Sequence, residues 1–455
     1  MREYIVAIEF GSTKVVGIAG YRNDNNQLVV AAIDSENTAS NMMKRGCIQN
    51  VKDVYACVQR VKRKLENRIS PAKIEKIYVG VGGVSVVADD KISVRTLPED
   101  SMIKQVQIDK MKDDCRKTIP SSVDLLELVS VGYIVDGRAE RNPIGVVGSN
   151  IEARYKAITA KPMLKRNIDH CIAELKLPIA GYITSALATA EVVLSNEDRM
   201  LGCMLIDMGA ETTTVSIYKN NVLVLLETLP MGGRNITRDI MSLNFVHDTA
   251  EKLKIASGKA KGYNSENNIR LNLDNDSSVG IDLAKLSSVV EARSEEIVAN
   301  IDEQIKRSGL ERKDLVIGAV VVGGAARLEG MKSLLEERLN INVRTGVLSR
   351  DILVVEKLEA QVNDYVQAVG LLALAKDVCT ISPVPVVEDV KDTDADSQGN
   401  REVVPSDNVT KPTELPDENE KKKKKWGWFD GMKKSVQKYT QKFDEMLEEG
   451  ANEDE

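Results

Sequence analysis

Two similar hairpins, 198 residues apart, constrain the fold more than any other feature of the chain. The first, EYIVAIEFGSTKVVGIAGY, runs a strand into Glu9, a turn over 10–14 and a returning strand. The second, CMLIDMGAETTTVSIY, does the same through Asp207 and a turn over 209–213. Each has an acid at the strand end, a glycine two residues later and hydroxyls in the turn. The pair predicts a duplicated fold that clamps one ligand from both sides.

The residue types in these hairpins indicate what the ligand is. A tight turn with free N–H groups and hydroxyls can hold a phosphate, and carboxylates can hold Mg²⁺, usually through its waters. One such hairpin is a weak signal, since glycine, serine and threonine are common in any hairpin turn. A third segment, IGAVVVGGAARLEGM at 317–331, runs an apolar strand into small residues that let the backbone approach a flat ligand. An ordinary close strand–helix turn would also explain it.

The charge of the chain is concentrated in its last 73 residues, whereas residues 1–382 are neutral overall. A neutral body gives no support for nucleic-acid binding. Residues 383–420 carry 11 acids and 3 bases among prolines and polar residues, which is typical of a disordered linker. Residues 421–442 carry 9 lysines and 1 acid, and residues 443–455 carry 7 acids.

The lysine-rich segment also reads as an amphipathic helix. At 100° per residue its apolar side chains fall on one arc, with most lysines of the helix outside it. This pattern favours a helix lying in a membrane interface, although a helix that packs on the body or on a partner, or a nuclear-localisation signal, would use some of the same residues. The predicted membrane-binding residues are Trp426, Trp428, Phe429, Met432, Val436, Tyr439 and Phe443.

Several classes of protein are disfavoured. No run approaches the ~18 apolar residues of a membrane-spanning helix, and the start MREYIVAIEF reads as a strand rather than a signal peptide, which predicts a cytoplasmic protein. The six cysteines lack CxxC spacing and there are only two histidines, His170 and His247. A disulfide framework, a thiolate zinc site and a histidine-based catalytic triad are therefore not expected.

The two hairpins followed by VVVGGAA resemble the actin, sugar-kinase and heat-shock ATPase superfamily, in which two α/β lobes enclose ATP. Within it the chain resembles the bacterial cell-division FtsA family, through VSVGYIVDGRAERNPIGVVGSNIEARYKAITA (129–160), LPMGGRNITRDI (229–240), AEKLKIASG (250–258) and the basic amphipathic tail. The resemblance implies an actin-like (ribonuclease H-like) two-lobe fold with an inserted subdomain. The implied parts are a first lobe (1–83, 161–200 and 361–382), an inserted subdomain for filament contacts (84–160), a second lobe (201–360) with an FtsZ-binding subdomain at about 229–310, a linker (383–420), a membrane-targeting helix (421–448) and an acidic tail (449–455).

The same resemblance implies an ATP and Mg²⁺ site. Glu9 and Asp207 would face the Mg²⁺, through water. The implied nucleotide-binding residues are Gly11, Ser12, Thr13, Lys14, Gly209, Thr212, Thr213, Gly232, Gly233, Asn235, Glu251, Lys254, Gly323, Gly324 and Ala325. Simple hairpin turns and a solvated Glu251–Lys254 pair would be the ordinary explanation of the same residues.

The second hairpin departs from the superfamily pattern DIGGGTTD, since it reads DMGAETTT. Glu211 adds a negative charge close to phosphates unless it points away or faces the metal, and Thr214 replaces an acid that could orient a water. We therefore expect ATP to act as a switch, with slow or absent hydrolysis.

The implied partners are those of a division protein. Lys285 and Arg293, in LAKLSSVVEARSEEIVANI (283–301), match basic positions that meet the acidic C-terminal peptide of FtsZ, although two solvated helix charges would look the same. Further copies of the chain, an anionic membrane surface and other division proteins are also implied, which would place the chain at the cytoplasmic face of the cell membrane at the septum. Another actin-like scaffold, for shape or pilus assembly, and a chaperone-like ATPase remain the alternatives.

Overall fold

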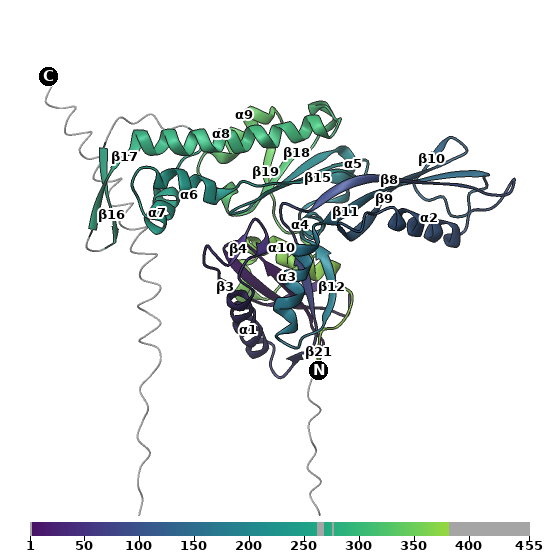
Figure 1. The fold of residues 1–455 in the computed structure, drawn as a ribbon, viewed down its shortest axis with the longest axis horizontal. Helices are drawn as coiled ribbons and strands as arrows, with labels where there is room; N and C mark the ends of the chain where they lie inside the picture. The colour runs from purple at the N-terminus through teal and green to yellow at the C-terminus, as the bar shows by residue number, and fades with distance from the viewer. Residues whose placement is uncertain (1, 262–267, 275–276, 382–455) are drawn as a thin grey trace, which may run out of the picture. The chain divides into compact units, whose positions relative to one another are not determined.

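The computed structural model describes residues 2–261, 268–274 and 277–381. All of these residues belong to one compact unit, Met1–Pro385. This unit contains two lobes and a projecting subdomain (Figure 1). The expectation of an actin-like α/β fold is confirmed by the sheets described below.

The first lobe is built on a mixed sheet in the order β12-β7-β1-β2-β3-β20. Its strands read as continuous apolar runs because helices cover the sheet and exclude water from it. Helix α1 begins after Asn50, whose side chain accepts a hydrogen bond from the Asp53 amide, and it buries one face on the sheet. The elements are β1 (Ile5–Phe10), β2 (Lys14–Arg22), β3 (Leu28–Asn37), β4 (Met43–Lys44), β5 (Cys47–Ile48), α1 (Val51–Arg68), β6 (Lys73–Ile74), β7 (Ile77–Val81), α3 (Pro162–Ala173), β12 (Ile179–Thr184), α4 (Ser185–Val193), β20 (Leu353–Val354), η3 (Glu356–Leu358), η4 (Val362–Tyr365), α10 (Val366–Leu374) and β21 (Thr380–Ile381).

The second lobe repeats this plan in the order β15-β14-β13-β18-β19. Each sheet begins with three antiparallel strands that follow one another in the sequence. Further strands then pair parallel to the first of the three, β7 beside β1 and β18 beside β13. The elements are α5 (Asn196–Leu201), β13 (Cys203–Met208), β14 (Thr213–Lys219), β15 (Val222–Leu229), α6 (Gly233–Met241), α7 (His247–Ser257), β16 (Asn268–Asp274), β17 (Ser277–Asp282), α8 (Leu283–Arg307), η1 (Arg312–Asp314), β18 (Gly318–Val322), η2 (Ala325–Arg327), α9 (Met331–Leu339) and β19 (Val343–Thr345).

The sheet of the second lobe is buried on both faces. Along β13, Met204 and Ile206 join the core beneath α6, α8 and α9, whereas Cys203 and Leu205 join the core shared with the first lobe. This alternation follows from the two-residue period of a strand. One hydrophobic core therefore extends across both lobes.

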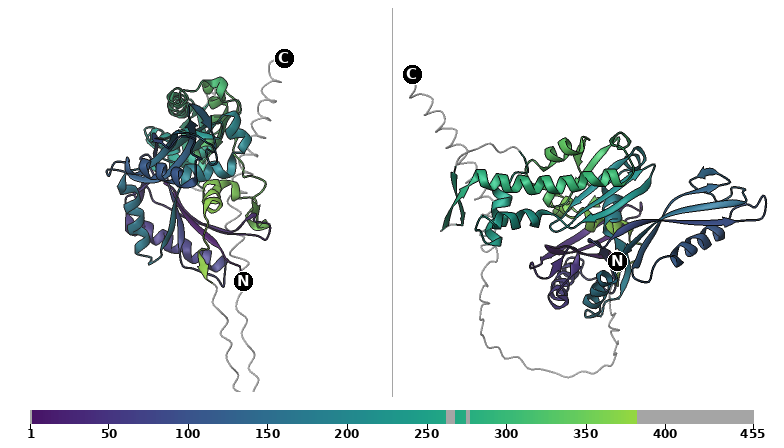
Figure 2. Two further views of the ribbon diagram at one scale, coloured as in Figure 1. Left: turned by 90° about the vertical axis from the view of Figure 1, so that its right-hand side faces the viewer. Right: turned by 45° about the horizontal axis from the view of Figure 1, so that its top comes forward.

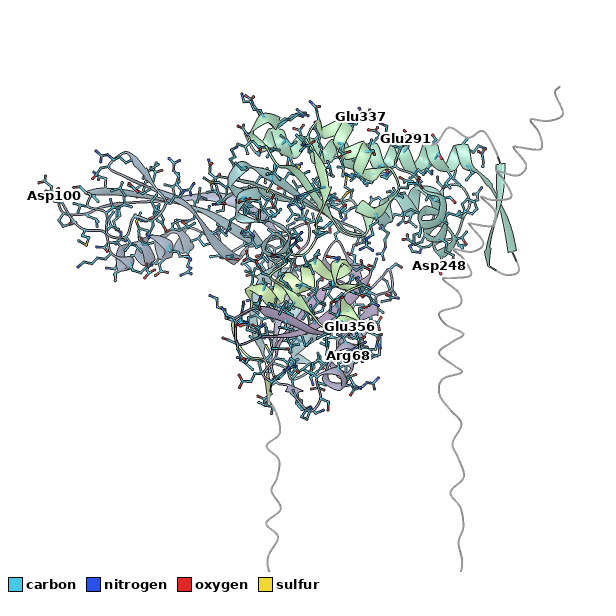
Figure 3. The ribbon with its side chains drawn as sticks, turned by 180° about the vertical axis from the view of Figure 1, so that it is seen from behind. Arg68, Asp100, Asp248, Glu291, Glu337 and Glu356 are labelled. Carbon is cyan, nitrogen blue, oxygen red and sulfur yellow. The ribbon has the colours of Figure 1, made fainter. Side chains whose placement is uncertain are left out.

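The projecting subdomain is inserted into the first lobe between β7 and α3. Its antiparallel sheet has the order β10-β9-β11-β8 and comprises β8 (Val87–Thr96), β9 (Asp124–Val135), β10 (Arg138–Glu140) and β11 (Asn150–Ala160), with α2 (Gln105–Lys117) on one face. Figure 2 shows it extending away from both lobes, and Asp100 marks its outer end in Figure 3. At its inner end, β8 and β9 contact β15 of the second lobe.

The lobes are joined by two chain crossings. Helix α4 precedes the first crossing and packs on α10, and β20 pairs with β3, so the chain is back in the first sheet by Leu353. The prediction that the chain returns to the first lobe at residue 361 therefore places the return too late. The sequence does not show the earlier return because β20 is a two-residue edge strand, too short to give a periodic pattern.

Candidate nucleotide-binding site

A cleft of about 700 Å³ lies between the lobes, and both hairpin turns line it. The volume falls in the range of small-molecule sites. Gly82, Gly83 and Ser185 line it from the first lobe, and Gly323 to Ala325 line it from the second. We call this the interlobe cleft.

The β1–β2 turn presents backbone and hydroxyl groups to the cleft. The Gly11 amide donates to the Lys14 carbonyl over 2.9 Å, which closes the turn. A Cβ on Gly11 would lie 2.8 Å from that same oxygen, so the turn requires glycine here. Lys14 lies with its Nζ 4.0 Å from the centre of the Tyr365 ring, in a cation–π contact at the edge of the cleft. Ser12 and Thr13 also line the cleft.

The β13–β14 turn is held by the start of helix α6. The Gly209 amide donates to the Thr212 carbonyl over 2.8 Å, and the Gly233 amide donates to the Gly209 carbonyl over 3.0 Å. A Cβ on Gly232 would lie 2.5 Å from the Gly209 oxygen. Gly232 and Gly233 therefore bring the N-terminus of α6 against the turn, where the Arg234 amide also donates to the Ala210 carbonyl over 2.6 Å.

Two carboxyl groups, one from each hairpin, meet at the floor of the cleft. Removal from water raises the pKa of Glu9 from 4.5 to about 7, with repulsion from Asp207 as a second cause and attraction to Lys14 opposing it. Removal from water also raises the pKa of Asp207 to about 6. Two buried carboxyl groups that meet at one point supply oxygen ligands of the kind that hold Mg²⁺ together with waters and phosphates. The residues present therefore fit the metal.

Helix α7 provides the opposite end of the cleft. Lys254 donates to Glu251 over 2.8 Å, to Thr237 Oγ1 over 3.0 Å and to the Gly233 carbonyl over 3.2 Å. Burial acts to raise the pKa of Glu251, but the hydrogen bonds from Lys254 and Thr237 outweigh it and the net pKa is lowered. Glu251 is thus a fixed anion, suited to accept hydrogen bonds from a hydroxyl-bearing ligand.

The structure gathers most of the predicted site residues in this cleft. Glu9, Asp207 and twelve of the fifteen predicted nucleotide-binding residues line it. The other three lie behind the surface: the buried Thr213 hydroxyl donates to the Met231 carbonyl over 2.9 Å, and Asn235 Oδ1 accepts from the Gly232 amide over 3.1 Å. The side chains of Thr213 and Asn235 and the backbone of Gly232 shape the second turn and the start of α6.

Several residues that line the cleft are not among the predicted site residues. Gly82 and Gly83 follow β7, and Thr184 and Ser185 stand where β12 ends and α4 begins. Asn363, Tyr365 and Gln367 come from η4 and the start of α10. A rule that ligands bind beyond the carboxyl ends of parallel strands would have found the first group. Nothing local marks the second group, because it reaches the cleft through the return of the chain to the first lobe.

Glu211, the residue that broke the sequence pattern, points away from the cleft. It does not line the cleft and is 5% exposed. Arg234 Nη1 donates to its Oε1 over 2.8 Å, and the Arg45 amide donates to its Oε2 over 2.6 Å. The expected repulsion of phosphates is thereby neutralised.

The two residues predicted to bind the FtsZ peptide differ in their environment. Both lie on α8, where Lys285 is exposed and pairs with Asp282 over 3.4 Å. Arg293 is held by Asp239 on α6 and by Glu296. The Asp239 hydrogen bond raises the pKa of Arg293, so its charge is permanent. Within the described residues, an incoming carboxylate at this point would have to share Arg293 with two existing partners.

The predicted linker and membrane-binding segment, 383–455, lie outside the described residues. Among the residues that are described, the helices lack the length and apolar character needed to cross a membrane. That same portion of the chain contains no group of three or more histidine, cysteine or acidic side chains arranged to hold a metal. A two-carboxylate site at Glu9 and Asp207 falls below that size.

Comparison with known proteins first indicates the class of protein to which the chain is similar. A family model described as type IV pilus assembly protein PilM matches residues 7–267, and one described as cell division protein FtsA matches residues 204–370. A solved PilM–PilN type IV pilus biogenesis complex has a TM-score of 0.59 at 13% identity, covering 81% of this chain and 97% of that one, which shows the shared fold. With its duplicated sheets and interlobe cleft, the chain is an actin-like protein of the class that the PilM and FtsA families share.

Curated relatives then give the family. The cell division protein FtsA of Porphyromonas gingivalis is 29% identical over 389 residues, covering 84% of this chain and 80% of that protein. FtsA of Bacillus subtilis is 25% identical over 76% of this chain and 78% of that protein, and FtsA of Escherichia coli is 23% identical over 83% and 91%. Over most of its length the chain is therefore similar to the FtsA family of bacterial cell division proteins.

Proposed function

We propose that the chain binds ATP with Mg²⁺ in the interlobe cleft and that the bound nucleotide controls its assembly at the membrane, where it holds FtsZ filaments. The observation that carries the proposal is the cleft itself, in which both hairpin turns, two carboxyl groups and the α6 N-terminus converge on one cavity. A ligand with a polyphosphate chain would contact both lobes at once and stabilise their closed arrangement.

Each part of the cleft has a chemical role in this proposal. The turn at 11–14 and the turn at 209–212 would hold the phosphates through backbone N–H groups and hydroxyls, and Glu9 and Asp207 would hold Mg²⁺. The metal would neutralise phosphate charge. Glu251 would accept from the ribose hydroxyls, and Gly323 to Ala325 would border the adenosine.

The residue at 214 supports slow hydrolysis. Thr214 lines the cleft, and its hydroxyl lies 3.2 Å from that of Thr228. A hydroxyl pair lacks the basicity of a carboxylate for taking a proton from water at neutral pH. The nucleotide would therefore persist long enough to act as a switch.

The membrane and FtsZ parts of the proposal rest on the sequence and the family. Each lysine near an anionic surface contributes roughly 1 kcal/mol, and the aromatic face of 426–443 adds apolar burial. Weak binding by one copy becomes firm when several copies engage together. The FtsZ C-terminal peptide is proposed to meet α8 near Lys285 and Arg293, and filament contacts are proposed for 84–160.

Co-sedimentation with anionic liposomes tests the membrane step. The intact chain and a chain ending at Glu420 are compared with and without Mg-ATP. We expect binding by the intact chain alone, strengthened by Mg-ATP, and loss of binding when Phe429, Val436 and Phe443 are replaced by serine. Equal sedimentation of both chains, or no dependence on the three apolar residues, would refute the membrane anchor.

A second candidate function is a scaffold for pilus assembly, which the match of the PilM family model over 7–267 favours. The two candidates differ in their partner. Binding of a fluorescent FtsZ C-terminal peptide to the intact chain, weakened by R293A and not by the exposed K332A on α9, supports the division scaffold. Absence of peptide binding by a chain that still binds nucleotide would favour the pilus-type scaffold.

A further inference from the structure

A buried ion pair lies between the lobes, next to the interlobe cleft and outside the set of residues that line it. Arg234, at the start of α6, is 8% exposed and donates through Nη1 to Glu211 Oε1 over 2.8 Å. Glu211 is 5% exposed and belongs to the β13–β14 turn. Both residues belong to the second lobe, and both reach the first.

Two hydrogen bonds connect this ion pair to the first lobe. The backbone amide of Arg45, between β4 and β5, donates to Glu211 Oε2 over 2.6 Å. Arg234 Nη2 donates to the carbonyl of Ser12 over 3.3 Å. Ser12 stands in the middle of the β1–β2 turn, and its carbonyl also accepts from Thr38 Oγ1 over 3.1 Å.

The chemistry of these contacts makes them directional. A guanidinium is a planar fork whose separate nitrogens donate to two acceptors at fixed angles, whereas an ammonium has a single nitrogen with rotatable donors on a flexible stem. Charge-assisted hydrogen bonds in a water-excluded site are strong, and a partner left unpaired there is costly. Opening the lobes would break two of these bonds and leave Glu211 with one donor fewer.

We propose that Glu211 and Arg234 form an interlobe clasp, and that Arg234 is a positioning residue which fixes the β1–β2 turn in the geometry that receives the nucleotide phosphates. This rests on the proposed nucleotide site. The clasp explains why this chain has a glutamate at 211 where small residues would suffice for the turn. The carboxylate serves the lobe interface, and the phosphates meet the other side of the turn.

Nucleotide binding to the full chain tests the positioning role. R234K keeps a positive charge against Glu211 but lacks the second nitrogen through which Arg234 reaches the Ser12 carbonyl. We expect R234K and R234A to raise the Kd for ATP and ADP by about tenfold, with adenosine binding unchanged, because only the phosphate turn is released. R238Q is the matched control: Arg238 lies one turn along α6, with Nη2 3.6 Å from Glu211 Oε1 and a 53% exposed side chain, so its ATP affinity is expected to stay within about twofold of the unmutated chain.

Equal loss of ATP and adenosine binding in R234K would show a general folding role and overturn the positioning role. Unchanged ATP binding in a folded R234A would do the same. If the unmutated chain binds no nucleotide, the proposed function fails, and a second measurement still decides on the clasp.

That measurement is the distance between the lobes without nucleotide. Spin labels on cysteines introduced at Glu337 on α9 and Glu356 in η3 report it, since both positions are exposed and lie on opposite lobes (Figure 3). E211Q leaves one of the two donors facing an amide NH₂. We expect E211Q and R234A to broaden the distance distribution toward longer values, and R238Q to match the unmutated chain. Identical distributions in all four proteins would overturn the clasp.

Discussion

At the scale of single residues, the two adjacent glycines of VVVGGAA have different reasons to be glycine. Gly323 has φ +92°, and a Cβ there would lie 2.4 Å from the Met208 carbonyl and 2.7 Å from Asp207 Oδ1. Gly324 has open space around the corresponding point. The first glycine therefore lets the loop cross the end of β13 beside the carboxyl pair, and the second leaves room in the cleft.

Replacing these glycines separately tests that difference. G323A forces a left-handed backbone and a clash with β13, so we expect it to lower the free energy of unfolding by about 2 kcal/mol or more. G324A has neither problem and is expected to change it by less than about 0.5 kcal/mol. Urea denaturation of both variants gives the comparison, and similar losses would contradict the structural distinction.

The pKa of Glu9 predicts a pH dependence of stability in the absence of Mg²⁺. Its folded-state pKa of about 7 lies above the unfolded value of 4.5, so the folded state binds more protons between these values. Stability from this group therefore falls as the pH rises through that window, and the loss is complete above about pH 7. Thermal unfolding of the unmutated chain and of E9Q should differ in this slope.

Adding Mg²⁺ should reverse part of that loss, because the metal binds the ionised carboxylates. We expect Mg²⁺ to raise the melting temperature more at about pH 8 than at about pH 6, and E9Q to weaken the effect. An equal Mg²⁺ effect at both pH values would argue that the ion does not bind at this pair.

At the scale of elements, helices α4 and α10 pack closely against each other where the chain passes between the lobes. A Cβ on Gly370 of α10 would lie 2.0 Å from the Ala188 carbonyl of α4. Small residues in both helices allow this approach. The sequence shows the small residues of α4 in ITSALATAE (183–191), but it does not show which face of that helix meets α10.

Substituting Gly370 tests the crossing. G370A must push the helices apart, because the obstacle is backbone rather than a flexible side chain, and we expect a loss of about 2–4 kcal/mol in unfolding free energy. A373G on the same helix should cost only about 1 kcal/mol, from helix propensity. Circular dichroism during denaturation measures both, and a stabilising G370A would show that the helices are not this close in solution.

The hairpins, the sheets and most of the cleft could be predicted from the sequence because their signals are local. Glu9, Gly11 and Asp207 stand at fixed offsets within one strand–turn unit. Arg234 and Tyr365 are not predicted as site residues from the sequence, since their contacts depend on which lobe they face once the chain has crossed twice. The sequence marks Glu211 as a departure from the superfamily pattern, but its contacts with Arg45 and Arg234 come only from the fold.

At the scale of the whole molecule, the shared core predicts that the lobes unfold together. Val320 and Val322 of the second lobe belong to the same hydrophobic cluster as Ile8 and Val79 of the first. We expect one calorimetric transition for the body of the protein, in which the calorimetric and van't Hoff enthalpies agree. Mg-ATP at about 100 times its Kd should raise the stability of this transition by about 2.7 kcal/mol. Two separated transitions would show that the lobes are independent.

The projecting subdomain also has a mechanical consequence. It is covalently part of the first lobe, yet β8 and β9 contact β15 of the second, and its outer end near Asp100 lies far from both (Figure 3). A neighbour that binds the outer end acts on a lever, and the resulting torque falls on the junction of the two lobes. We expect the exchange rate of bound nucleotide to differ between free and assembled protein, and stopped-flow exchange at low and high protein concentration measures it. Contact with neighbouring copies would thus change the time for which each copy retains a bound nucleotide.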